Sequence, residues 1–181
     1  DGADTFYFLD NTNPGQIRLD GGDGADKFFF YTGYGTIDAI VEDQSSLGLG
    51  QENLIRIIGG TPTDASTDDT VTVSNIDITF GGSTVAYVSP GAIANTDQLL
   101  IEVRGRGGDD TLNVVSTDAV VPVRLEGGAG DDTFRIGGAT GLNDIDYIAQ
   151  PNLNDGLGLG PVVAVGGAGH DILIADDSQD N

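Results

Sequence analysis

A short glycine–aspartate segment recurs along the chain, and it restricts the possible folds more than any other feature. Three intact copies follow the pattern Gly-Gly-x-Gly-x-Asp, and they begin at Gly21, Gly127 and Gly166. A variant copy begins at Gly105, a truncated copy occupies residues 1–4, and a degenerate copy runs over residues 59–69. Internal repeats of this kind indicate a fold in which one structural unit is used several times.

Apolar residues alternate with other residues on both sides of each copy. The positions two and four residues after the last Asp are apolar: Phe6 and Phe8, Phe28 and Phe30, Val71 and Val73, Leu112 and Val114, and Phe134 and Ile136. A period of two is typical of a β-strand, whose side chains point alternately to opposite faces. Each unit therefore predicts a strand, a Gly-Asp turn and a second strand, and no long stretch has a helical pattern.

The separation between copies indicates how the units are arranged. The last Asp residues of neighbouring copies are 22 residues apart in two cases, and 39, 41 and 43 residues apart in the others. A coil of about 22 residues holds two short strands and two turns, and stacked coils bury a core that no single coil could form. We therefore predict an all-β fold, a right-handed parallel β-solenoid or β-roll with coils of about 22 residues. A β-sandwich is the alternative.

The longer gaps predict inserted loops or hairpins within a single domain. We expect residues 1–181 to form one repeat-built β-solenoid segment, an excerpt of a longer chain, with inserts at 31–58, 74–98 and 137–160. Residues 78–87 predict a hairpin, because Gly81 and Gly82 can form a tight turn between two short strands.

Charge and composition exclude several classes of function. The chain carries 29 acidic and 7 basic residues, for a formal net charge of −22, so phosphate-rich nucleic acids and anionic membranes are not expected partners. It has no cysteine, and no apolar run is long enough to insert into a membrane. Leu, Ile, Val and Phe make up 50 of the 181 residues, enough for a core, so the chain is not expected to be disordered.

The Gly-Gly-x-Gly-x-Asp turn predicts a calcium site. Glycines let the backbone bend sharply and direct carbonyl oxygens toward one point, and the short Asp side chain adds a carboxylate. A flexible set of hard oxygen ligands suits Ca²⁺ better than Mg²⁺. In stacked coils, a divalent cation between neighbouring Asp residues would turn their repulsion into attraction. Plain glycine-rich corners with solvated acids are the alternative.

These turns resemble the hemolysin-type, or RTX, calcium-binding repeats of secreted bacterial proteins, in which consecutive turns of a β-roll hold Ca²⁺ ions. The resemblance implies that the last Asp of each copy is a carboxylate ligand: Asp4, Asp26, Asp110, Asp132 and Asp171. It implies carbonyl ligands at Gly22, Gly24, Gly128 and Gly130, with Asp1 and Asp23 at the third position. The predicted metal set also includes Asp69 of the degenerate copy, and Asp109 and Asp131, which precede the last Asp.

The remaining charged residues suggest no catalytic centre, so we do not expect an enzyme. The single histidine, His170, occupies a variable position of a repeat, where a surface role is expected. Arg18, Arg56 and Arg124 each lie between two apolar positions that precede a glycine pair. They are expected to point outward on one face and to pair with acids on neighbouring coils.

Taken together, these features predict a calcium-binding structural module of a large extracellular bacterial protein, in which folding is coupled to Ca²⁺. Such a module would form a stiff rod, a filament or a surface layer at the cell surface. Further copies or adjacent repeats are the expected partners, through end-to-end stacking of coils. The alternatives are an accessory secretion or targeting domain of a secreted enzyme, and an adhesin.

Overall fold

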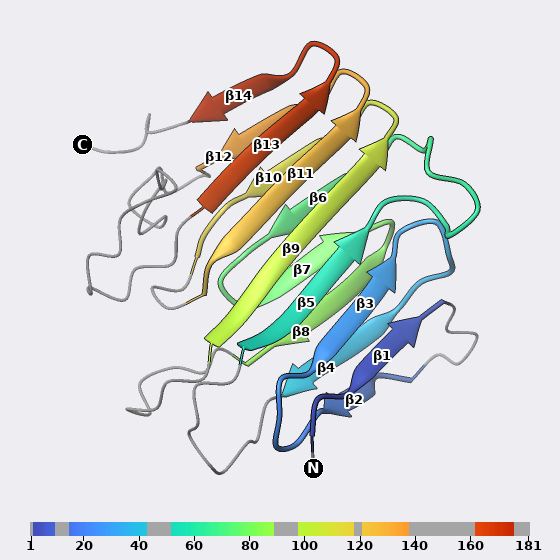
Figure 1. Ribbon diagram of the computed structural model, residues 1–181, viewed down its shortest axis with the longest axis vertical. Coiled ribbons are helices and arrows are strands. Elements are labelled where there is room, and N and C mark those ends of the chain that lie inside the picture. Colours follow the sequence, from blue (N-terminus) through green and yellow to red (C-terminus); the bar gives the residue numbers. More distant parts are fainter. Residues whose placement is uncertain are drawn as a thin grey trace.

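The computed structural model describes residues 2–9, 15–42, 52–88, 98–117, 121–137 and 162–175, which form fourteen strands in two sheets (Figure 1). Within these ranges, no helix long and apolar enough to cross a membrane is present. The predicted strands on both sides of the Gly-Asp turns are confirmed, because the turns at 21–26, 105–110, 127–132 and 166–171 each join two strands.

One sheet has six strands, and every neighbouring pair in it is parallel. Its strands, in spatial order, are β1 (Thr5–Phe8), β3 (Lys27–Tyr31), β5 (Glu52–Ile58), β9 (Gln98–Gly107), β11 (Val123–Ala129) and β13 (Val162–Ala168). The 22-residue spacing between the first two motif copies is also the offset between paired strands, since Thr5 of β1 pairs with Lys27 of β3.

The second sheet has eight strands and is mixed. Its strands, in spatial order, are β14 (Ile172–Ala175), β12 (Thr133–Ile136), β10 (Thr111–Val114), β6 (Thr70–Val73), β7 (Asp77–Phe80), β8 (Ser83–Tyr87), β4 (Asp38–Glu42) and β2 (Ile17–Asp20). Strand β7 runs antiparallel to both of its neighbours, whereas the other pairs are parallel.

The core lies between the two sheets. The six-stranded sheet contributes buried side chains that include Phe30, Ile57, Ile101 and Leu125, and the eight-stranded sheet contributes Val73, Ile78, Val85, Leu112 and Ile136. At one end the aromatic rings stack across β1 and β3, with centroids 5.1 Å apart for Phe6 and Phe28 and 4.8 Å apart for Phe8 and Phe30. The alternating apolar positions of the sequence are therefore the positions that fill the core.

The prediction of a parallel β-solenoid was wrong. The described residues form two facing sheets, one parallel and one mixed, and this arrangement resembles the sandwich that was the alternative. The difference arises at the hairpin predicted over residues 78–87, which is confirmed as β7 and β8 joined at Gly81 and Gly82. The hairpin is an insert between two coils, and it hydrogen-bonds into the eight-stranded sheet between β4 and β6. Its apolar side chains Ile78 and Val85 are fully buried in the shared core, which holds it there.

The three segments expected as inserts differ in what the structure describes of them. Residues 31–58 include β4 and β5, one strand in each sheet, and residues 74–98 include β7 and β8. Most of the third segment, residues 138–160, lies outside the described residues.

The place of the hairpin in the core generates a prediction. Ile78→Ala removes a side chain that is 0 % exposed, so we expect it to lower the free energy of global unfolding by about 2–5 kcal/mol in denaturant titrations. Ile76→Ala, at a position 63 % exposed on the same hairpin, is the matched control and should change stability by less than about 0.5 kcal/mol. Equal effects of the two substitutions would show that the hairpin does not share the core.

Candidate functional site at the acidic turns

The Gly-Asp turns lie at two opposite edges of the sandwich. The turn at residues 21–26 leads from β2 in the eight-stranded sheet into β3 in the six-stranded sheet. The turns at 105–110, 127–132 and 166–171, and the longer connection at 59–69, lead the other way, out of the six-stranded sheet. We call these the entry edge and the exit edge (Figure 1). The predicted metal ligands are therefore divided between two places that the body of the protein separates.

The last Asp of each turn joins its turn to the next one through a hydrogen bond. Its Oδ1 atom accepts the backbone N–H of the corresponding residue in the neighbouring turn, and we call this series the inner ladder. At the exit edge the N–H groups donate from Asp69 to Asp110 (2.8 Å), from Asp110 to Asp132 (3.0 Å) and from Asp132 to Asp171 (3.1 Å). At the entry edge they donate from Asp4 to Asp26 (2.8 Å) and from Asp26 to Asn53 Oδ1 (2.7 Å).

A second series, the outer ladder, involves the residues just before the last Asp at the exit edge. Here the direction is reversed, because each N–H donates to the carboxylate of the preceding turn. Asp109 donates to Asp68, Asp131 to Asp109, and His170 to Asp131, each over 2.9 Å. These residues are exposed, and the backbone contact of His170 agrees with the surface role expected for it. In the turns at 105–110 and 127–132, one of the two adjacent acids therefore accepts a hydrogen bond from the preceding turn and the other accepts one from the following turn.

The first glycine of each turn makes room for the inner-ladder carboxylate. A Cβ atom added to Gly21, Gly105, Gly127 or Gly166 would lie 2.0 to 2.2 Å from Oδ2 of the last Asp in the same turn. No side chain can occupy that space unless the carboxylate moves. A glycine is therefore needed at the first position because the Asp side chain folds back over its own turn.

The predicted carbonyl ligands are also engaged in packing between turns. The third-position carbonyl of Asp23 accepts the N–H of Gly2 at 2.8 Å, and the equivalent carbonyls of Ala129 and Ala168 accept those of Gly108 and Gly130. A Cβ atom on Gly167 would lie 2.0 Å from the Gly128 oxygen, and one on Gly169 would lie 1.8 Å from the Gly130 oxygen. Gly22 and Gly24 lie in the entry-edge turn with φ angles of 76° and 138°.

The arrangement of the carboxylates bears on whether a metal site is already assembled. In the described part of the chain, no three Asp, Glu or His side chains come together in a way that could hold a metal ion. Oδ1 of each of four inner-ladder carboxylates accepts the N–H of the preceding turn, and Oδ2 lies beside the first glycine of its own turn: Asp26, Asp110, Asp132 and Asp171. Asp1 lies outside the described residues. The predicted ligands are therefore adjacent along each ladder, but their oxygens do not converge on a common point.

The inner ladder at the exit edge concentrates negative charge in the interior. Asp110 is 1 % exposed and Asp132 is 0 % exposed, and Oδ2 of each has no hydrogen-bond partner. Burial, followed by repulsion from Asp132, Asp69 and Asp68, raises the pKa of Asp110 to about 7, although the hydrogen bond from the Asp69 N–H acts in the opposite direction. Burial and the charge of Asp171 likewise raise the pKa of Asp132. Ionisation of the exit-edge carboxylates Asp110 and Asp132 is thus unfavourable in the folded protein.

Two residues that complete the turns were not singled out in the sequence. Asn53 ends the entry-edge ladder with an amide in place of a carboxylate, and its position two residues before Ile55 matches that of Asp26 before Phe28. Arg106 stands where other copies have a second glycine, and its φ angle of 79° is in the left-handed region. Its guanidinium donates to the carbonyls of Gly59 (3.1 Å) and Thr61 (2.7 Å), so a permanent cation covers the neighbouring turn.

Comparison with protein-family models, with curated proteins and with solved structures finds no match to this chain. Functional inference therefore rests on the residues and their geometry.

The raised pKa of Asp110 generates a prediction about pH. In the unfolded chain an Asp titrates near pH 3.9, so the folded state binds more protons between about pH 4 and pH 7. Stability should therefore rise as the pH falls through this window, by at most about 1.4 kcal/mol per pH unit from this group. Asp110→Asn retains an oxygen for the Asp69 N–H and removes the charge, so it should be more stable than the wild type at pH 8 and about equal at pH 4.

Denaturant titrations at several pH values measure this difference. Asp77→Asn, in the β7–β8 hairpin away from the acidic turns, is the control and should leave the pH dependence almost unchanged. If the free energy of unfolding of Asp110→Asn depends on pH between pH 8 and pH 5 as steeply as that of the wild type, Asp110 is not the group responsible for this dependence.

The inward position of the carboxylates generates a second prediction. Gly127→Ala places a methyl group 2.1 Å from Asp132 Oδ2, so we expect a loss of about 1–3 kcal/mol in the free energy of unfolding. Gly15→Ala, where an added Cβ meets nothing within 4 Å, should change stability by less than about 0.5 kcal/mol. If Gly127→Ala is equally harmless, the carboxylate does not lie over its own turn.

Proposed function

We propose that this chain is a non-catalytic structural module of a large extracellular bacterial protein, contributing to a stiff rod, a filament or a surface layer. The observation that supports this proposal most directly is the inner ladder, in which every intact motif contributes its carboxylate to the neighbouring turn. A hydrogen bond to a charged acceptor contributes about 1.5–3 kcal/mol. The acidic motifs therefore serve to hold successive turns together.

The pairing of strands extends the same argument. Each turn is fixed by two ladders at the exit edge, and the strands on either side are fixed by parallel pairing in both sheets. Such a unit can transmit force along the stacking direction without bending at its turns. Stacking on adjacent repeats or further copies remains part of the proposal, because a strand at the edge of a sheet has unpaired N–H and C=O groups.

Calcium binding is the second candidate, and one specific observation favours it. The buried Oδ2 atoms of Asp110 and Asp132 have no hydrogen-bond partner, so each needs a proton or a cation to offset its charge. Carboxylate and carbonyl oxygens are the ligands that Ca²⁺ prefers. In this form of the proposal the carboxylates rotate away from Gly105 and Gly127 when the ion binds, and calcium stabilises the folded state by linkage.

A calcium titration separates the two candidates. The protein is treated with EDTA and dialysed, and far-UV circular dichroism and thermal melting are recorded as Ca²⁺ or Mg²⁺ is added. The ladder model predicts a full β-sheet signal without metal and no change in melting temperature with either ion. Loss of the signal in EDTA and its recovery with Ca²⁺ but not Mg²⁺ would overturn that model and support folding coupled to calcium.

A matched pair of variants identifies the responsible turn. If calcium acts through the inner ladder, Asp132→Asn should abolish the calcium-dependent rise in melting temperature. Asp77→Asn is the control, because Asp77 lies in the β7–β8 hairpin and accepts a hydrogen bond from Ser74 at 2.6 Å, away from the acidic turns.

A further inference from the structure

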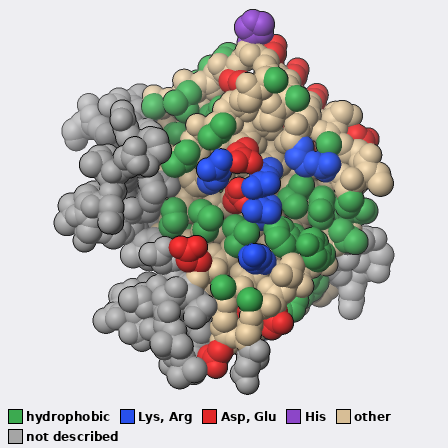
Figure 2. Space-filling model, viewed as in Figure 1, with side chains coloured by type: hydrophobic (Ala, Val, Ile, Leu, Met, Phe, Trp, Pro, Cys, Tyr) green, Lys and Arg blue, Asp and Glu red, His purple; other side chains and the backbone are tan. Residues whose placement is uncertain are grey.

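The outer face of the six-stranded sheet has an unusual composition for a surface open to solvent. Sheets in which all strands are parallel are normally covered on both faces. Among the described residues this face is open, and it combines apolar, aromatic and basic side chains (Figure 2). Four of the seven basic residues of the chain lie on these strands and face outward: Lys27, Arg56, Arg104 and Arg124.

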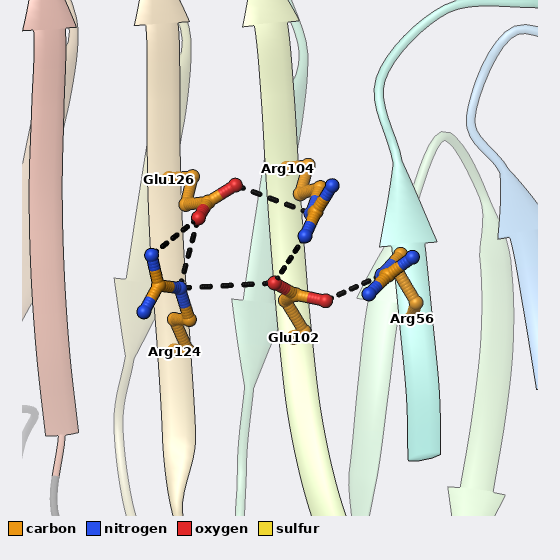
Figure 3. Close-up of polar contacts among 5 residues, drawn as sticks. All are labelled: Arg56, Glu102, Arg104, Arg124 and Glu126. Atoms are coloured by element: carbon orange, nitrogen blue, oxygen red, sulfur yellow. Dashed lines mark hydrogen bonds and ion pairs between the residues drawn. The ribbon is translucent and has the colours of Figure 1, made fainter. Parts of the chain in front are cut away.

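A network of five charged side chains occupies the centre of this face (Figure 3). Glu102 on β9 pairs with Arg56 from β5, with Nη2 of Arg104 at 2.7 Å, and with Nε of Arg124 from β11 at 3.7 Å. Glu126 pairs with Arg104 at 3.1 Å and with Arg124 at 2.6 Å. Glu102 is only 4 % exposed although it faces outward, because the three arginines surround it. The predicted pairing with acids on neighbouring strands is thus confirmed for Arg56, Arg124 and Arg18, which pairs with Glu42. The expectation that the three arginines share one face was wrong, because Arg18 lies on the eight-stranded sheet.

The network leaves an excess of positive charge in a fixed position. Three guanidinium groups share two carboxylates, and a guanidinium has five N–H donors, of which each arginine here uses only some. Arg124 remains 44 % exposed at its side chain. The buried Glu102 therefore holds basic groups in place while they still present donors to an anion.

Aromatic rings continue this row on one side of the network. The rings of Tyr7 and Phe29 are stacked with centroids 4.9 Å apart, and the guanidinium of Arg56 lies 5.1 Å from the Phe29 centroid. Strand register places Tyr7, Phe29, Arg56, Glu102 and Arg124 opposite one another on consecutive strands. At about 4.8 Å per strand the row is about 19 Å long. Tyr7 is 62 % exposed and offers a ring to a ligand.

We propose that this face is a binding surface for an acidic polysaccharide, a polymer of sugar rings that carry carboxylates. The flat faces of sugar rings stack on aromatic side chains such as Tyr7, and the carboxylates would accept bidentate hydrogen bonds from the guanidinium groups. The length of the row suits an extended polymer rather than a single sugar. The chain carries a net charge of −22, so its acidic surfaces repel such a polymer. The polymer can approach at the basic centre of this face.

Two other classes of partner fit the face less well. Glutamate is depleted at the core of protein–protein interfaces, whereas two glutamates, Glu102 and Glu126, stand at the centre of this face. Duplex DNA carries one charge per about 1.7 Å, so repulsion from a chain of charge −22 would be much stronger than for a polymer with one charge per sugar ring.

The test is a binding measurement with polygalacturonate as the probe, by isothermal titration calorimetry at low ionic strength. Arg124→Gln should weaken binding about tenfold, because it removes a charged donor while Glu102 and Glu126 keep Arg104 as a partner. Tyr7→Ala should weaken it about fivefold through loss of ring stacking. Arg18→Gln is the matched control, since Arg18 is an exposed, paired arginine on the opposite sheet, and it should bind like the wild type.

The outcomes are distinct. Binding that falls with added salt and with Arg124→Gln and Tyr7→Ala, but not with Arg18→Gln, supports the proposal. Absence of binding, or equal binding by all variants, overturns it. Equal affinity for neutral dextran would overturn the role of the arginines, and tighter binding of duplex DNA would assign the face to nucleic acid. Because none of these results depends on the acidic turns, failure here is distinguishable from failure of the structural role.

Discussion

The hydrogen bond from a backbone N–H to the carboxylate of the neighbouring turn is the interaction on which the rest of this structure depends. A turn at the edge of a sandwich leaves N–H groups that no strand can satisfy, and a buried N–H without a partner costs about 1–3 kcal/mol. The inner ladder satisfies these groups with Asp side chains over 2.7 to 3.1 Å, counting Asn53 at the entry edge. Because the carboxylate must fold back over its own turn, the first position has to be glycine, and because it must reach the next turn, the strands must keep their register.

The inner ladder places negatively charged carboxylates close together, and at the exit edge their mutual repulsion opposes folding. Asp110 and Asp132 are adjacent and buried, and burial is the main cause that raises the pKa of both. The charge of Asp132 raises the pKa of Asp110 further, whereas the 3.0 Å hydrogen bond from the Asp110 N–H acts to lower the pKa of Asp132. At the entry edge, the series ends with the neutral Asn53. At the exit edge, Arg106 brings a permanent cation to the carbonyls of Gly59 and Thr61 despite its unfavourable φ angle. The two edges thus differ in charge, because the entry-edge ladder includes a neutral amide and the exit-edge ladder consists of carboxylates with a guanidinium on the neighbouring connection.

Much of the local structure could be predicted from the sequence, because the alternation of apolar residues and the glycine–aspartate turns are local signals. The strands flanking the turns and the hairpin at β7 and β8 follow directly from them. The edge at which each turn lies could not be predicted from spacing alone. Three strands separate the turn at 21–26 from the connection at 59–69, whereas four strands and then two separate the later turns. An odd number of strands puts the first turn at the opposite edge, and an even number keeps the later turns at the same edge. The sequence also could not predict the direction in which each carboxylate points, because the N–H that it binds belongs to a turn 22 or more residues away in the chain.

The insertion of one hairpin into only one of the two sheets has a geometric consequence for the whole module. Six strands at about 4.8 Å spacing span about 24 Å, whereas eight strands span about 34 Å. The excess of about 10 Å is close to the distance between two packed sheets, so the layers cannot run flat and parallel past the hairpin. The β7–β8 hairpin widens the eight-stranded sheet by two strands relative to the six-stranded sheet, so the wider layer has to curve around the narrower one.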